Sequence, residues 1–429
     1  MHIFFSGIGG AGISPLALIA HQAGYQVSGS DKVDSRTIVY LKSHGIDNIH
    51  IGQSLEQIKS VNESSPIDWF VYSSAISLEQ PDSQELDYCQ KSGIKTSKRD
   101  EFLNFLLTEK KQKMIAVAGT HGKSTTTAMV IWLFKQFHIP ISYSLGAKIG
   151  FGDTGSYDNR SQFFVYEADE FDYNFLNFKP FYSIISGVSW DHHEIFKTRD
   201  DYKQAFRQFI DQSDSIIILP EDAEYLNLGS NPKIKILNKD GTNAIKLIGT
   251  YNRLDGLLAV EAFKDVTGLE LTEVTAKINE FPGLERRMEE IIPNLYSDYA
   301  HTPEKIKAAM SVASEMAVDN NQPIFVIYEP LTNRRQHYVR DLYGDVFNGA
   351  EHIYWIPSYL AREDPELPIL EPSELIQSLN DPTIASAAKM DESLLKTIKK
   401  HLSEGAMVVA LNGGGGGGLD EWLRANFSH

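Results

Sequence analysis

The stretch from Met114 to Met129 constrains the fold more than any other part of the chain. It reads MIAVAGTHGKSTTTAM: an apolar run, a turn bounded by two glycines, and a threonine-rich segment. The apolar run predicts a buried parallel strand, because such strands are covered on both faces. The turn lets backbone N–H groups close on phosphate oxygens, and the N-terminus of the next helix attracts the same anion. The stretch therefore predicts a strand–turn–helix unit that binds a nucleoside triphosphate.

The turn differs from the generic phosphate loop in one respect. The generic pattern is G-x-x-x-x-G-K-[ST], and its first glycine would fall at Val117, so the loop here is of a shorter form. Lys123 would reach the β- and γ-phosphates, and the Ser124 hydroxyl would bind Mg²⁺. An ordinary strand–turn–helix with a chance Gly-Lys-Ser is the alternative. The residues expected to hold the triphosphate are Gly119, Thr120, His121, Gly122, Lys123, Ser124 and Thr125.

Composition narrows the class of protein. The 429 residues predict two to three domains at about 150 residues each. Cys89 is the single cysteine, so no disulfide forms within the chain and a reducing compartment is expected. The N-terminus lacks the pattern of a signal peptide, and no segment approaches about eighteen uninterrupted apolar residues. We therefore expect a cytoplasmic protein that does not enter a membrane.

Charge limits the possible partners. The formal net charge of −17 argues against a nucleic-acid groove, which needs a basic surface. The same charge means that an anionic substrate must be held by local cations and backbone amides against an unfavourable overall field.

Strand-like runs alternate with helical patterns along almost the whole chain, which predicts α/β domains on parallel sheets. We expect domains at 1–112, 113–290 and 291–429, with a basic linker at 109–113. The first opens with a strand, the turn Gly7–Gly12 and a helix, a βαβ start with the G-x-G-x-x-G pattern. The second contains the phosphate loop and a strand at Tyr182–Val188.

Seven motifs, in order along nearly the whole chain, resemble those of the Mur ligase family, the ATP-dependent amino-acid and peptide ligases of peptidoglycan synthesis. They are GIGGAGIS (Gly7–Ser14), SGSD (Ser28–Asp31), AGTHGKSTTT (Ala118–Thr127), EADEFD (Glu167–Asp172), DHH (Asp191–His193), RRME (Arg286–Glu289) and DYAHTP (Asp298–Pro303). The G-x-G-x-x-G pattern alone would fit a dinucleotide-dependent oxidoreductase equally well. The combination favours the ligase family.

The resemblance implies three domains: a Rossmann-like N-terminal domain that binds a UDP-sugar, a central P-loop ATPase-like domain, and a Rossmann-like C-terminal domain that binds the amino compound and closes over both. It implies that the lactoyl carboxylate of UDP-N-acetylmuramate attacks the γ-phosphate of ATP. An amine then displaces phosphate from the acyl phosphate so formed.

Two amine substrates are open within this family. The first-domain motif GIGGAGIS favours L-alanine, in peptidoglycan precursor synthesis. Glu329-Pro330 with Asn333 resembles the member that joins the recycled tripeptide L-alanyl-γ-D-glutamyl-meso-diaminopimelate. A non-catalytic nucleotide-binding regulator is a further alternative.

The resemblance also implies the roles of individual residues. Lys123, Glu167 and His192 would be catalytic, and Ser124, Glu167 and His192 would bind Mg²⁺. Imidazole is an unusual Mg²⁺ ligand, so Mn²⁺ is expected to substitute. Asp191 would orient His192, whereas a solvated acidic loop is the alternative for Asp169, Glu170 and Asp172.

The remaining implied contacts concern the substrates. ATP would also contact Asn252, Arg287 and Asp298. The UDP-sugar would be bound by Gly9, Gly10, Ser14, Asp31 and Ser73, and the amino acid by Arg335, Tyr359 and Arg362. We expect an unmodified lysine at Lys203 and a monomer or weak homodimer.

Overall fold

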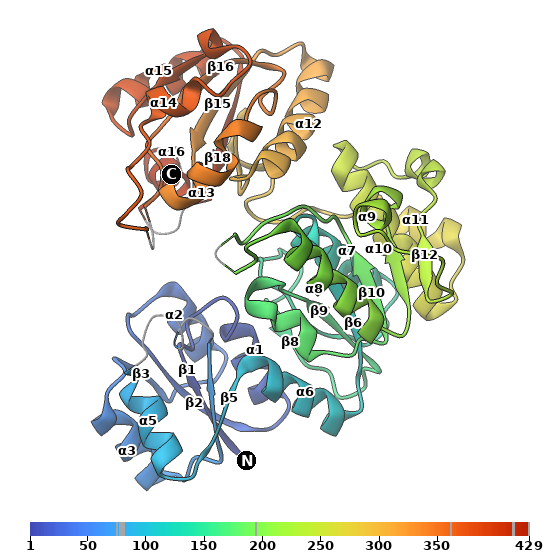
Figure 1. Ribbon diagram of the computed structural model, residues 1–429, viewed down its shortest axis with the longest axis vertical. Coiled ribbons are helices and arrows are strands. Elements are labelled where there is room, and N and C mark those ends of the chain that lie inside the picture. The colour runs from blue at the N-terminus through green and yellow to red at the C-terminus, as the bar shows by residue number, and fades with distance from the viewer. Residues whose placement is uncertain (74–75, 77–81, 194, 361–362, 414–416, 428–429) are drawn as a thin grey trace. The chain divides into compact units, whose positions relative to one another are not determined.

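The computed structural model describes residues 1–73, 76, 82–193, 195–360, 363–413 and 417–427, and within them the strands form three sheets (Figure 1). The chain divides into two compact units. The first comprises Met1–Ile245 and Asp255–Phe281, and the second comprises Lys246–Leu254 and Pro282–His429. Two sheets belong to the first unit and one belongs to the second. The exact domain boundaries expected from the sequence remain a prediction.

The first sheet has the strand order β3-β2-β1-β4-β5, and all of its pairings are parallel. Its strands are β1 (His2–Ser6), β2 (Gln26–Asp31), β3 (Ile49–Ile51), β4 (Trp69–Tyr72) and β5 (Lys95–Lys98). Its helices are α1 (Ser14–Gln22), α2 (Arg36–Ser43), α3 (Leu55–Ser64), α5 (Gln84–Lys91) and α6 (Arg99–Lys110). Successive residues of β1 enter different cores: Ile3 and Phe5 join one, and Phe4 joins another. Both faces of the strand are thus covered, as expected for a parallel sheet.

The second sheet has the order β12-β11-β10-β6-β9-β7-β8, in which only the pair β7–β8 is antiparallel within the described residues. Its strands are β6 (Lys113–Ala118), β7 (Ser142–Ser144), β8 (Gly155–Ser156), β9 (Phe163–Glu167), β10 (Tyr182–Ile185), β11 (Ile216–Ile218) and β12 (Ile234–Ile236). Its helices are α7 (Lys123–Gln136), α8 (Arg199–Gln212), α9 (Pro220–Tyr225), α10 (Thr250–Thr267) and α11 (Leu271–Ile278), with 3₁₀ helices η1 (Phe171–Asn177) and η2 (Lys239–Ala244). The register pairs Val117 of β6 with Glu167 of β9, which brings Glu167 to the start of the phosphate loop.

The third sheet has the order β13-β14-β18-β15-β16-β17. Its strands are β13 (Glu289–Ile292), β14 (Leu295–Asp298), β15 (Ile324–Glu329), β16 (Ala350–Trp355), β17 (Ala385–Ala387) and β18 (Met407–Asn412). Its helices are α12 (Pro303–Asn320), α13 (Asn333–Val339), α14 (Pro372–Ile376), α15 (Glu392–Ser403) and α16 (Leu419–Phe427), with 3₁₀ helices η3 (Arg340–Leu342) and η4 (Pro382–Ile384). One face packs with α12 and α14, and the other packs with α15 and α16.

The expected linker at 109–113 is wrong in extent. Helix α6 continues to Lys110 and β6 begins at Lys113, so only Lys111 and Gln112 lie between them. The basic residues end a helix, where they complement the negative end of its dipole. The Gln112 side chain is buried and donates to Ser142 Oγ at 2.9 Å. One apolar core includes residues of both sheets, so the first two expected domains pack together in a single compact unit.

Across the described residues, no helix combines the length and the apolar character that crossing a lipid bilayer requires.

Candidate active site

The turn between β6 and α7 has a backbone that only glycine accommodates at two positions. Gly119 has a φ of 152° and Gly122 a φ of 77°, both on the left-handed side. A Cβ atom on Gly119 would lie 2.7 Å from Ser186 Oγ, and one on Gly122 would lie 2.7 Å from Asp255 Oδ1. Gly122 also caps α7. The glycines therefore shape the turn that the sequence predicts for phosphate binding.

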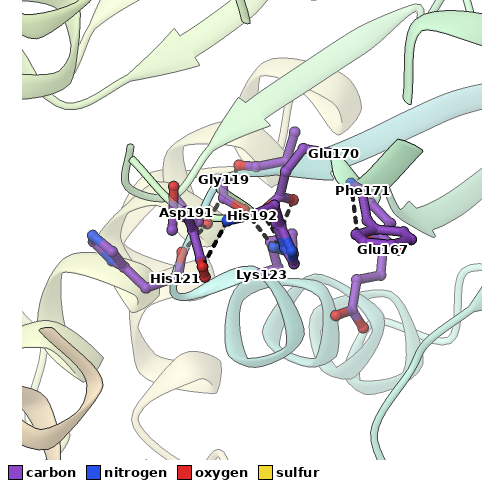
Figure 2. A network of polar contacts seen from close by, with 12 residues as sticks. Gly119, His121, Lys123, Glu167, Glu170, Phe171, Asp191 and His192 are labelled. Atoms are coloured by element: carbon purple, nitrogen blue, oxygen red, sulfur yellow. Dashed lines mark hydrogen bonds and ion pairs between the residues drawn. The ribbon is translucent and has the colours of Figure 1, made fainter. Parts of the chain in front are cut away.

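Lys123 begins α7, and its ammonium group is held inside the turn (Figure 2). Its Nζ donates to the carbonyl oxygen of Gly119 and, at 2.8 Å, to Glu170 Oε2. Burial lowers the pKa of Lys123, but the charges of Glu170 and Asp169 outweigh that effect and raise its pKa above the ordinary value. Lys123 is consequently a buried cation at neutral pH.

Glu170 is the central anion of the site. Its side chain is fully buried, and Oε1 lies 3.6 Å from His192 Nε2 and accepts the Tyr202 hydroxyl at 3.3 Å. Burial alone would raise the pKa of Glu170. The charges of Lys123 and then His192 outweigh burial and lower the pKa from 4.5 to about 2. The interpretation as a solvated loop does not hold for Glu170, because α8 and α7 supply the groups that enclose it. The role of Glu170 was not predicted from the sequence, although a buried lysine in the turn requires some counter-charge nearby.

Ser124 and Glu167 form a second pair of groups beside Lys123. The Ser124 hydroxyl donates to Glu167 Oε1 at 2.7 Å, and Glu167 Oε2 accepts the backbone N–H of Gly146 at 2.7 Å. A hydroxyl and a carboxylate in contact are hard oxygen donors, and Mg²⁺ is usually held by one or two such protein groups with phosphates and water completing its shell. These two residues fit that donor set. No group of three or more His, Cys, Asp or Glu side chains suited to a metal occurs among the described residues.

The loop after β10 folds over the phosphate-loop turn. The backbone N–H of Thr120 donates to the Gly187 carbonyl at 2.7 Å, and the Ser186 hydroxyl donates to the His121 carbonyl at 2.7 Å. A Cβ on Gly187 would lie 2.0 Å from His121 Cε1, so the imidazole packs directly on this glycine. Strand β10 therefore ends at Ile185, whereas the apolar pattern predicts it to Val188. That expectation is wrong because only the Ser186 N–H still donates to β6, at the Ala118 carbonyl, whereas the Gly187 carbonyl bonds to the turn and the Val188 N–H donates to Asp222 Oδ1.

Two further side chains tie this loop to the site. The Thr120 hydroxyl donates to the Ser189 carbonyl at 2.6 Å and shares a hydrogen bond of 2.7 Å with Tyr202. Asp191 Oδ1 accepts the backbone N–H of His192 at 2.7 Å, so Asp191 orients the backbone of His192. His192 has a φ of 52°, and its ring meets the Phe171 ring edge-on. Lys203, by contrast, places its ammonium over the Tyr225 ring.

The glycine turn of the first sheet gathers the predicted UDP-sugar residues. The backbone N–H of Gly9 donates to Asp31 Oδ2 at 2.8 Å, and that of Gly10 donates to the Gly7 carbonyl at 3.0 Å. Ser14 begins α1 and is buried, and Ser73 follows β4 with its hydroxyl 3.4 Å from a Cβ placed on Gly7. The structure thus brings these residues together at the carboxyl ends of β1, β2 and β4. Their contacts with a ligand remain a prediction.

The other predicted residues lie in the second compact unit. Arg287 Nη1 lies 3.7 Å from Asp298 Oδ1, and Asn252 Nδ2 donates to the Ile248 carbonyl at 2.8 Å. Burial raises the pKa of Asp298 above its ordinary value, with Arg287 opposing that shift. Arg335 in α13 and Tyr359 belong to segments that meet: Thr332 caps the backbone of Arg335, and its own N–H donates to the Tyr359 carbonyl. Arg362 lies outside the described residues.

A glycine turn, a buried lysine at the start of a helix and a serine–carboxylate pair define a phosphate-loop protein with a magnesium-compatible donor set. Comparison with known proteins extends this conclusion. Residues 2–111 match the catalytic domain of the Mur ligase family, and residues 117–250 match the Mur ligase middle domain. The chain belongs to the Mur ligase family, whose members are ATP-dependent ligases.

Relatives of nearly equal length carry the same name. The UDP-N-acetylmuramate–L-alanine ligase of Clostridium acetobutylicum is 26% identical over 450 residues, covering 96% of this chain and 95% of the relative. That of Rickettsia felis is 28% identical over 464 residues, covering 96% and 93%.

Solved structures agree on the fold. The UDP-N-acetylmuramate-alanine ligase of Thermotoga maritima matches with a TM-score of 0.74 at 25% identity, covering 97% of this chain and 96% of that one. A murein peptide ligase from Psychrobacter arcticus shares the fold, with a TM-score of 0.67 at 22% identity, covering 100% and 99%. The three-domain α/β architecture expected from the sequence is confirmed.

Proposed function

We propose that this protein joins the lactoyl carboxylate of UDP-N-acetylmuramate to the amino group of L-alanine, with ATP as the energy source. The observation that carries the proposal is the buried Lys123–Glu170 ion pair inside the glycine turn, with Ser124 and Glu167 beside it. The names of two relatives that span nearly the whole chain support the choice of substrates.

The chemistry of the first step is phosphoryl transfer, which depends mainly on positioning and on neutralising charge. Lys123 would place its ammonium at the transferred phosphate, where a charged hydrogen bond contributes roughly 1.5–3 kcal/mol. Ser124 and Glu167 would hold Mg²⁺, which supplies positive charge at the β- and γ-phosphates when bound. The carboxylate oxygen forms a bond to phosphorus, the bond to the β–γ bridging oxygen breaks, and ADP leaves.

Glu170 has a distinct part in this scheme. It keeps Lys123 ionised and pointing into the turn before nucleotide binds, so Lys123 does not have to take up a proton when the nucleotide arrives. The hydrogen bond from Tyr202 and the nearby His192 hold Glu170 itself in place. His192 Nε2 lies 3.6 Å from Glu170 Oε1, which supports its proposed catalytic role.

The second step is attack of the amine on the acyl phosphate carbonyl with release of phosphate. Arg335 is proposed to bind the carboxylate of the incoming amino acid, a contact that suits the planar guanidinium. Tyr359 lies on the adjoining segment, and Arg362 would contribute a second cation.

A specific sequence observation keeps the tripeptide as a second candidate. Glu329 ends β15, is buried, and accepts the backbone N–H of Leu419 at 3.1 Å. Asn333 bonds the backbone around Pro368 and Leu370 through both polar atoms of its amide. These residues distinguish the chain from the pattern expected for the alanine-adding members, so the amine must be tested directly.

The test is release of phosphate from ATP with UDP-N-acetylmuramate and either L-alanine or the tripeptide. We expect turnover with L-alanine; turnover with the tripeptide alone would replace the proposed amine. Lys123→Ala should abolish turnover yet leave UDP-N-acetylmuramate binding nearly intact, because the predicted UDP-sugar residues lie on a different sheet. We further propose that the protein works in the cytoplasm as a monomer or weak homodimer, without nucleic-acid or membrane partners.

A further inference from the structure

Arg99 connects the first sheet with the acidic loop, which we define as residues 169–172. It begins α6 directly after β5, and its side chain is only 17% exposed. Its Nη2 donates to Asp169 Oδ2 at 3.3 Å, and its Nε lies 3.5 Å from Asp100 Oδ1. Asp169 Oδ1 in turn accepts the backbone N–H of Phe171 at 3.1 Å. Arg99 therefore fixes the residue that immediately precedes Glu170.

A second contact fixes the other end of the acidic loop. Lys98 Nζ lies 2.6 Å from Asp172 Oδ2. Asp172 and Tyr173 have φ values of 54° and 57°, in the left-handed region. Such a conformation is unfavourable for a residue other than glycine and persists only where surrounding contacts impose it. The shape of the loop that carries Glu170 thus depends on Lys98, the last residue of β5, and Arg99, the first residue of α6.

The guanidinium of Arg99 also lies directly against the glycine turn of the first sheet. A Cβ atom placed on Gly12 would be 1.8 Å from Arg99 Nη1 and 3.0 Å from its Cζ. In dinucleotide-binding folds the third glycine of this pattern allows close packing between helix and strand. Here the residue that needs the space is Arg99.

We propose that Arg99 is a positioning residue that couples the UDP-sugar turn to the phosphoryl-transfer site. The path runs from Gly12 through the guanidinium to Asp169, and along one peptide bond to Glu170, which holds Lys123. A nucleoside diphosphate sugar bound at the Gly7–Gly12 turn fixes Arg99 and thereby the acidic loop. The inference rests on the proposed function, because it requires a UDP-sugar at this turn.

The coupling has a thermodynamic consequence. If one ligand stabilises the arrangement that the other requires, each must tighten the binding of the other by the same factor. We expect UDP-N-acetylmuramate to lower the Kd of a non-hydrolysable ATP analogue by roughly fivefold or more, and the reciprocal change to match. Titration calorimetry with each ligand alone, and then with the other present at saturation, measures this factor.

Arg99→Ala should reduce the factor to near one while each separate Kd changes less than about threefold. Arg99→Lys should also give a factor near one, because a single ammonium cannot lie beside Asp100, bond Asp169 and contact Gly12 at the same time, as the larger guanidinium does. Arg160→Ala is the matched control, since Arg160 is an exposed cation of the same unit that pairs with Asp158. The coupling factor measured for Arg160→Ala should equal that of the unmodified protein.

Gly12→Ala provides an independent test, because the added methyl group must displace the guanidinium. It should bring the coupling factor toward one, as Arg99→Ala does. A factor in Gly12→Ala equal to that of the unmodified protein would show that the packing of Arg99 against Gly12 does not carry the coupling. This variant and Arg99→Lys also decide the question if Arg99→Ala fails to fold.

The outcomes separate the inference from the function on which it depends. Absence of UDP-N-acetylmuramate binding by the unmodified protein would overturn both. Binding of both ligands without coupling, or coupling that survives in Arg99→Ala or Arg99→Lys, would overturn the role of Arg99 alone.

Discussion

The site depends on a buried ammonium that stays charged. A lone buried charge is costly, and removal of one partner from a buried ion pair typically destabilises a protein by about 3–5 kcal/mol. Lys123 is held by Glu170, and Glu170 by Tyr202 and the neighbouring His192. Nucleotide binding is predicted to use the positive charge of Lys123. The folded protein must stabilise that same charge when no nucleotide is bound.

Glu170→Gln should consequently lower both activity and stability. The amide keeps the volume of the side chain but leaves Lys123 without its counter-charge, so we expect kcat to fall by at least about 100-fold and urea unfolding to shift to lower concentration. Glu63→Gln, the same change at an exposed position of α3, is the control and should change stability by less than about 1 kcal/mol. Normal turnover in Glu170→Gln would show that the charge of Glu170 is not needed for catalysis.

The acid dependence of this difference follows from the lowered pKa of Glu170. A carboxyl group with a folded pKa near 2 and an ordinary value of 4.5 contributes stability above pH 4.5 and loses it as the pH falls toward 2. The gap in unfolding free energy between the unmodified protein and Glu170→Gln should therefore narrow from pH 7 to pH 4. A gap that stayed constant would show that ionisation of Glu170 is not its source.

The pKa of Asp222 is shifted in the opposite direction to that of Glu170. It is buried in α9, its Oδ1 accepts the backbone N–H of Val188 at 2.9 Å, and burial raises its pKa from 3.8 to about 7. Because the folded pKa is the higher one, its contribution to stability is complete below pH 3.8 and is lost as the pH rises through 7. Asp222→Asn should thus be stabilised relative to the unmodified protein at pH 8 by a few kcal/mol, and by less at pH 5. Glu224→Gln, at an exposed position of the same helix, should show no such trend in thermal or urea unfolding.

At the scale of elements, the phosphate loop works because a strand end, a turn and a helix start meet in one geometry. Gly122 sits where a side chain would have to occupy the left-handed region and contact Asp255 Oδ1 at 2.7 Å. Gly122→Ala should weaken binding of an ATP analogue by at least tenfold and lower the melting temperature. Gly229→Ala is the matched control, because nothing lies within 4 Å of its added Cβ. Equal nucleotide affinity in both variants would argue against binding at this turn.

Elements were predictable from sequence where local pattern decides them. Strand β6 contains the apolar run that precedes the glycine turn, and α7 begins at Lys123, directly after that turn. Strand β10 ends early and the linker before β6 is short, because contacts from segments distant in sequence set those boundaries. The same reason hid Glu170 and Tyr202: a carboxylate in an acidic stretch and a tyrosine in an amphipathic helix carry no local sign of burial. The burial of these two side chains became visible only from the strand register and the packing of the folded protein.

At the scale of the whole molecule, the predicted ATP-binding residues fall in two compact units. Gly119–Thr125 belongs to the first unit, whereas Asn252, Arg287 and Asp298 belong to the second. Segment Lys246–Leu254 is attached to α12 of the second unit through Arg253 and Glu315, which form two charged hydrogen bonds at 2.8 and 2.9 Å. The prediction that these residues bind ATP can therefore be tested in each unit separately.

Hydrogen–deuterium exchange tests this prediction, because it reports the effect of the nucleotide on the backbone amides of each unit. A non-hydrolysable ATP analogue should slow amide exchange at 119–125 in the first unit and at 250–254 and 286–299 in the second. Strands β16 and β17, which carry none of the predicted ATP contacts, are the internal reference and should not change. Arg287→Ala should abolish the protection in the second unit but leave that at 119–125 largely in place, because backbone amides and Lys123 hold the phosphates there. Protection confined to 119–125 in the unmodified protein would assign the whole nucleotide site to the first unit and exclude Asn252, Arg287 and Asp298 from it.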